Sequence, residues 1–163
     1  MLAADSAPAL ATRPPLSWFA KVLVGLVLIA YAAWSVWAGP ATLRLVEAPL
    51  WVGQALLLAG ALVHLHHYYL LKSWNLRLDK PSKLLTDRGL FRRVRHPMYL
   101  GDAVALLGAF AMAGDALAAG LALFGVVALG ATCIHEDRAM AAAFGSEQRE
   151  WAARTKRMVP FVW

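Results

Sequence analysis

The chain has 163 residues, of which 60% are hydrophobic, with a formal net charge of +6 and a mean hydropathy of +0.54. The apolar fraction exceeds the roughly 45–50% of soluble domains, and the apolar residues gather in blocks of about 20, enough to cross a bilayer core of roughly 30 Å. The basic residues flank these blocks, so they indicate membrane orientation rather than nucleic-acid binding. The single cysteine, Cys133, excludes an internal disulfide and a cysteine-based metal cluster.

The first 71 residues predict a lead and two membrane spans. Residues 1–16 are rich in alanine and proline and lack the pattern of a cleaved signal peptide, so we expect a disordered lead. The first span is expected over residues 18–38, because Gly39-Pro40 ends the apolar run. The second is expected over residues 49–71, and its far end carries a cluster of His64, His66, His67, Tyr68 and Tyr69.

The one long polar connection covers residues 72–96. From Lys72 to Arg95 it has eight Lys and Arg residues against two Asp residues, a charge of +6 that equals the net charge of the whole chain. Such an excess of Lys and Arg in a short loop places the loop in the cytoplasm.

Two further spans follow, over residues 97–113 and 116–134. Pro97 suits the first turn of a helix, and Gly114-Asp115 forms a turn so short that the two helices must pack as an antiparallel hairpin. Glycines occur in both helices, and we expect them to let this pair approach closely. The remaining residues, 135–163, predict an amphipathic tail that either lies on the membrane or folds over the basic loop.

The predicted fold class is therefore all-α: a polytopic integral membrane helix bundle with four transmembrane helices and a C-terminal amphipathic segment. Residues 17–163 form one domain. With four spans, the basic loop and both termini fall on the cytoplasmic side of a bacterial-type inner membrane.

Three polar clusters meet at this cytoplasmic face: the histidines that end the second span, the His96–Tyr99–Asp102 start of the third, and His135–Arg138 after the fourth. Charged residues just outside a span are often simple anchors. The hairpin, however, brings His96 and Tyr99 close to Glu136, and this combination predicts a small-molecule pocket.

Several separate motifs resemble one family. Arg95-His96-Pro97-Met98-Tyr99-Leu100-Gly101 looks like the R-H-P-x-Y-x-G signature of the isoprenylcysteine carboxyl methyltransferase and phospholipid methyltransferase superfamily. The supporting matches are Leu84-Leu85-Thr86, Gly89-Leu90-Phe91, the acid pair Glu136-Asp137, Phe144-Gly145 and Val159-Pro160-Phe161. The resemblance covers roughly residues 83–163, the C-terminal half of the chain.

This resemblance implies an S-adenosylmethionine-dependent methyltransferase that acts on a hydrophobic or lipid-borne acceptor from the bilayer. The implied catalytic residues are Glu136, Asp137 and Arg138, with His135 a further candidate on the acceptor side. The implied cofactor-binding residues are Leu84, Leu85, Thr86, Gly89, Phe91, Arg95, His96, Pro97, Met98, Tyr99, Gly101 and Glu136. No residue is assigned to a metal.

The acceptor stays open between a carboxylate, an amine and a thiol. In the prenylcysteine enzymes an arginine one turn before the acid pair binds the substrate carboxylate, whereas this chain has Thr132 at that position. The second acid of the pair is also aspartate here, not glutamate. Both departures count against a prenylcysteine carboxylate. A phospholipid amine, a small thiol or another apolar acceptor agrees better with them.

Three alternatives compete with this interpretation. Gly101-Asp102 also resembles the H-P-x-Y-x-G-D of sterol-reductase-like membrane proteins, which would make NADPH the cofactor, gripped by Arg92, Arg93 and Arg95. The histidines could hold a metal, although a membrane di-iron enzyme would need several histidine-rich motifs. A non-enzymatic scaffold would tolerate loss of His96 and Glu136 without effect on any ligand.

Overall fold

The computed structural model describes residues 14–73 and 84–163. Positions 1–13 of the expected lead and 74–83 of the expected loop lie outside these residues. The described residues are helical, without a named strand, which confirms the all-α prediction. The helices are α1 (Leu16–Ala38), α2 (Leu50–Ser73), the short 3-10 helix η1 (Gly89–Arg92), α3 (Pro97–Ala113) and α4 (Ala116–Arg154).

Three of these helices, α1, α2 and α4, are long and apolar enough to cross a bilayer, whereas α3 has 17 residues. Large apolar side chains, among them Leu23, Leu58 and Phe124, are exposed on the outside of the bundle. Such a surface is stable where the surrounding solvent is lipid. The chain is therefore an integral membrane protein, and that α3 also spans the membrane stays a prediction.

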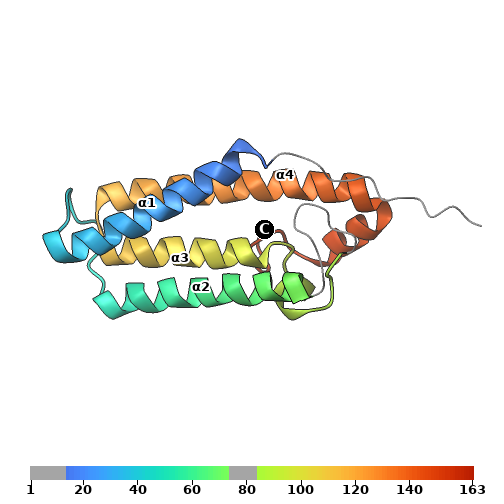
Figure 1. The fold of residues 1–163 in the computed structure, drawn as a ribbon, viewed down its shortest axis with the longest axis horizontal. Helices are drawn as coiled ribbons and strands as arrows, with labels where there is room; N and C mark the ends of the chain where they lie inside the picture. Colours follow the sequence, from blue (N-terminus) through green and yellow to red (C-terminus); the bar gives the residue numbers. More distant parts are fainter. Residues whose placement is uncertain (1–13, 74–83) are drawn as a thin grey trace, which may run out of the picture.

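Helix α3 is the centre of the bundle and contacts α1, α2 and α4, as Figure 1 shows. Its most extensive contact is with α2, and small residues make that contact possible. A Cβ atom at Gly101 would lie 2.6 Å from the carbonyl oxygen of Gly60, and one at Gly108 would lie 2.7 Å from that of Gly53. Two glycines seven residues apart on each helix thus bring the two backbones together.

This arrangement corrects in part the expectation that the glycines of the last two helices serve the α3–α4 pair. Gly101 and Gly108 face α2 instead, and Gly120 on α4 has open space where a Cβ would be, whereas Gly125 of α4 packs against Leu106 of α3 as expected. The reason is that helical spacing shows which residues share a face, but not which neighbour that face meets.

The end of the bundle remote from η1 confirms the predicted α3–α4 hairpin. Gly114 adopts a left-handed conformation with φ of 70° after the last residue of α3. Asp115 then caps α4, because its side chain accepts a hydrogen bond of 2.9 Å from the N–H of Ala118, and it also accepts one from the Tyr31 hydroxyl of α1. The hydrogen bond between Tyr31 and Asp115 thus connects α1 to the α3–α4 hairpin.

Helix α4 continues past residue 134, where the predicted span ends, and reaches Arg154 with a kink at Gly145. From His135 to Phe144 the sequence becomes polar without a helix-breaking residue, so the helix continues into its polar part without interruption, and the end of the span near residue 134 stays a prediction. At Gly145 the backbone turns sharply, with φ of 54° and ψ of −115°, a conformation that favours glycine. The last turns of α4 therefore fold back toward the bundle (Figure 1).

The C-terminal segment folds over the loop before α3, which decides between the two predicted positions of the tail. Trp151 is buried in a small core with Leu84, Leu85 and Phe91, and its indole N–H donates to the Phe91 carbonyl at 3.0 Å. Beyond α4, the N–H groups of Arg95 and His96 donate to the carbonyls of residues 156 and 157 at 2.8 and 2.9 Å.

The close contact between α2 and α3 leads to a stability prediction. Gly108→Ala places a methyl group against the α2 backbone, so we expect the free energy of unfolding to fall by about 1–3 kcal/mol, as overpacking usually costs. The melting midpoint in detergent, followed by tryptophan fluorescence, should drop by several degrees. Gly120→Ala is the matched control: it meets nothing within 4 Å and should leave the midpoint unchanged or raise it. Equal midpoints for both variants would contradict the packing described here.

Candidate functional site

The candidate site lies where α3 begins, beside the middle of α4. His96 is the residue before α3, and Pro97 occupies the first turn, where its missing N–H costs nothing. The backbone pairing with residues 156 and 157 holds His96 under the C-terminal segment, and its side chain is buried. His96 lies at the N-terminal end of α3, as predicted.

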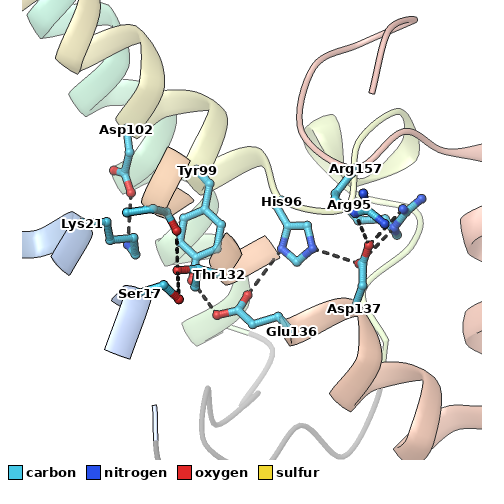
Figure 2. Close-up of polar contacts among 11 residues, drawn as sticks. Ser17, Lys21, Arg95, His96, Tyr99, Asp102, Thr132, Glu136, Asp137 and Arg157 are labelled. Carbon is cyan, nitrogen blue, oxygen red and sulfur yellow. Dashed lines mark hydrogen bonds and ion pairs between the residues drawn. The ribbon is translucent and has the colours of Figure 1, made fainter. Parts of the chain in front are cut away.

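The imidazole of His96 contacts both acids of α4. Its Nε2 lies 2.9 Å from an Asp137 carboxylate oxygen, and its Nδ1 lies 3.4 Å from a Glu136 oxygen, as Figure 2 shows. Burial alone would lower the pKa of His96, but the hydrogen bonds to Asp137 and Glu136 outweigh burial and raise that pKa above its ordinary value. His96 therefore lies between two carboxylates that favour its protonated form.

Asp137 is bound by three basic side chains. Arg95 donates to both carboxylate oxygens, at 3.1 and 3.0 Å, Arg157 donates at 2.7 Å, and His96 is the third partner. Burial would raise the pKa of Asp137, but these hydrogen bonds hold it well below its usual range. Asp137 thus joins the loop, α4 and the C-terminal segment, and its lone pairs are engaged in doing so.

Glu136 is different, because it remains accessible. The Tyr99 hydroxyl donates to one of its oxygens at 2.5 Å, and its side chain keeps 37% of its surface exposed. Tyr99 itself is buried and its ring stacks on His96 with centroids 5.6 Å apart. A carboxylate fixed on one side and open on the other can bind a cationic or hydroxyl-bearing ligand.

The loop that precedes His96 is held by α2. The Nε2 atom of His67 accepts a hydrogen bond of 3.0 Å from the N–H of Leu90, and its Nδ1 lies 2.7 Å from the Val63 carbonyl. Gly89, with φ of 50°, passes so close that a Cβ would lie 2.9 Å from His67 Nε2. The histidine cluster at the end of α2 thus includes a residue that positions the loop.

The other residues predicted for the site fall into three groups. Leu84, Leu85 and Phe91 are buried in the small core under the C-terminal segment, while Thr86 is half-buried at its edge. Gly101 packs against α2. Met98 is partly buried against the main core, and Arg138 is exposed without a hydrogen bond or ion pair among the described residues.

Some residues with evident roles were not predicted from the sequence. Arg157 and Trp151 come from the tail, which was expected either over the loop or on the membrane, without any residue of it assigned to the site. Lys21 is a lone charge within an apolar helix, and its ammonium lies 3.3 Å from Asp102. An isolated charge at membrane depth is a recognised sign of function, and this signal could have identified Lys21.

The histidines do not converge on one point. His64 pairs with Asp102 at 2.6 Å, His67 holds the loop, His66 is exposed, and the buried Nε2 of His135 has no hydrogen-bond partner among the described residues. Within the described ranges, no group of three or more His, Cys, Asp or Glu side chains is arranged to hold a metal ion.

Comparison with known proteins assigns the family. The sequence profile of the phospholipid methyltransferase family matches residues 48–147, which is more than half of the chain and includes His96, Glu136 and Asp137. The chain belongs to this family, and it is accordingly a methyltransferase of the membrane. The match confirms the resemblance read from the motifs and does not favour the reductase alternative. No curated protein and no solved structure matches the chain.

The three basic partners of Asp137 predict a large stability effect. Asp137→Asn leaves the Arg95 and Arg157 guanidinium groups without their counter-charge, and removing one partner of a buried ion pair typically costs about 3–5 kcal/mol. We expect a clearly lower melting midpoint and faster proteolysis of the C-terminal segment. Asp87→Asn changes an exposed residue and should leave both unchanged. A midpoint for Asp137→Asn equal to that of Asp87→Asn would show that the ion pairs of Asp137 do not stabilise the fold.

The raised pKa of His96 predicts a pH dependence of stability. The folded protein binds this proton more tightly than the unfolded chain does, so the stabilisation is complete below the ordinary histidine pKa of about 6.5 and is lost as pH rises through the folded value. Melting midpoints measured from neutral to alkaline pH should fall for the wild type and for His66→Gln. His96→Gln should show a smaller fall, and an identical slope would contradict the prediction.

Proposed function

We propose that the protein is an S-adenosylmethionine-dependent methyltransferase that methylates a lipid-borne or hydrophobic acceptor at the cytoplasmic face of the membrane. The observation that supports this most directly is the half-exposed Glu136 carboxylate, held by Tyr99 and His96 within the range that matches the family.

The donor and acceptor groups at the site fit S-adenosylmethionine. This cofactor carries an ammonium, a sulfonium and ribose hydroxyls, all of which suit a carboxylate. Glu136 uses part of its acceptor capacity on Tyr99 and His96 and retains lone pairs for a ligand. The first N–H groups of α3 suit the cofactor carboxylate, because a helix start attracts anions.

The remaining predicted residues take supporting roles in this proposal. Leu84, Leu85 and Phe91 pack beneath the loop and shape it, and Arg95 acts through Asp137. Asp137 was expected to be catalytic, but with three basic partners we assign it to holding the site together. Methyl transfer is an in-line displacement that depends on orientation and exclusion of water. Ion pairs that fix the loop against α4 and the C-terminal segment therefore favour the reaction.

The orientation of the site follows from its charges. The basic loop and the C-terminal segment are paired through their backbones, so they lie on the same side of the membrane. Both are rich in Lys and Arg, and the positive-inside rule puts this end of the bundle in the cytoplasm. The cytoplasm is also where S-adenosylmethionine is available to the site.

Cofactor binding tests the proposal. Purified protein in detergent should bind S-adenosylhomocysteine, measured by calorimetry, and Glu136→Gln should weaken binding by about 10- to 100-fold, as loss of a charged hydrogen bond worth about 1.5–3 kcal/mol implies. Glu147→Gln, which changes an exposed glutamate of the same helix, should bind normally. Tight binding of NADPH without binding of S-adenosylhomocysteine would overturn the proposal in favour of the reductase.

A further inference from the structure

A cavity with a volume of about 220 Å³ lies in the bundle on the side of Tyr99 away from His96. Its wall on α1 is apolar and includes Val22, Gly25, Leu26 and Ile29. Its polar residues are Lys21, His64 and Asp102, which come from three different helices. A half-open apolar pocket with polar groups from several helices has the form of a small-molecule site.

The polar residues of the cavity form a connected group. Asp102 bonds His64 Nδ1 at 2.6 Å and the Lys21 ammonium at 3.3 Å. Charged groups at membrane depth are costly, and those that persist usually serve a ligand or a proton path. Because Nδ1 donates to the carboxylate, the neutral ring carries its lone pair on Nε2. His64 also lines the cavity, so a base is available there.

Tyr99 separates this group from the proposed cofactor site. The Lys21 ammonium lies over the Tyr99 ring, 4.3 Å from its centroid, and the hydroxyl of the same ring bonds Glu136. Figure 2 shows Lys21 and Asp102 on one side of Tyr99, and Glu136 and His96 on the other. Tyr99 thus contacts both groups of residues, so the cavity lies next to the proposed cofactor site, and we assign it to the acceptor.

We propose that this cavity receives the apolar chain and nucleophilic group of the methyl acceptor, and that His64, oriented by Asp102, removes the proton of that nucleophile. This inference rests on the proposed methyltransferase function. It narrows the acceptor to an amphiphile whose nucleophile is protonated at neutral pH, a thiol or an ammonium. A carboxylate is already ionised there and needs no base.

The proposed reaction begins with the proton of the nucleophile. Nε2 of His64 takes the proton from the thiol or ammonium. The freed lone pair forms the new bond to the methyl carbon of the sulfonium donor, the carbon–sulfur bond breaks, and its electron pair stays on sulfur as a thioether. Asp102 stabilises the resulting imidazolium, and Lys21 holds the Asp102 carboxylate in place.

The acceptor class is tested with three probes of equal chain length: n-decanethiol, n-decylamine and n-decanoate, each incubated with the protein and methyl-labelled S-adenosylmethionine. We expect label in the thiol or the amine. Label chiefly in decanoate, or in none of the three, overturns the inference.

The role of His64 is tested with His64→Gln, which retains an amide that can reach Asp102 but has no base. We expect transfer to the preferred probe to fall by about 10²–10⁴-fold, with the affinity for S-adenosylhomocysteine changed less than twofold. His66→Gln, an exposed neighbour on the same helix, serves as the matched control. In His64→Ala, added imidazole should restore part of the rate, which a merely structural role for His64 would not allow.

The cavity itself is tested with Gly25→Leu. A Cβ atom at this position meets nothing within 4 Å, and Gly25 lines the cavity, so we expect the larger side chain to take up space there. We expect a higher KM for the probe and unchanged binding of S-adenosylhomocysteine. Gly120→Leu is the control, since its site is equally open but does not line the cavity.

These outcomes separate the two proposals. If S-adenosylhomocysteine does not bind, the methyltransferase proposal fails and the acceptor site fails with it. If it binds and label is transferred, but His64→Gln equals His66→Gln or Gly25→Leu equals Gly120→Leu, the acceptor site alone is overturned.

Discussion

The carboxylate of Asp137 joins the three segments from which the site is made. Its partners Arg95, His96 and Arg157 come from the loop, the start of α3 and the C-terminal segment. Charge-assisted hydrogen bonds of this kind are the strong ones, and partial burial protects them from screening by salt. The neighbouring Glu136 contacts Tyr99 and His96 and stays partly exposed. Asp137 therefore supports the structure, and Glu136 is the acid proposed to bind the ligand.

The contact between α2 and α3 has a similar consequence deeper in the bundle. Because glycines bring the two backbones together, the side chains at the end of α2 reach α3 and the loop before it. His67 accepts its hydrogen bond from the loop, and His64 reaches Asp102. A wider separation of these helices would release the loop and break the polar group of the cavity together.

Tyr99 connects the two halves of the proposed mechanism. Its hydroxyl holds Glu136, its ring stacks on His96, and its other face carries the Lys21 ammonium. Tyr99 is buried, so its ring is held in place between the two groups of residues. Methyl transfer depends on the relative orientation of donor and acceptor, and a fixed ring between their proposed sites serves that orientation.

The sequence by itself determined the helices, the hairpin and the family. Long apolar runs bounded by proline and glycine can form little else in a bilayer, and a two-residue turn necessarily brings His96 near Glu136. Only the tertiary structure decided which helix the glycines of α3 face, and that Asp137 is occupied by three basic groups. It also paired Lys21 with Asp102 across 81 residues of chain. Helical periodicity assigns a residue to a face of its own helix, whereas the partner of that face depends on how all the helices pack together.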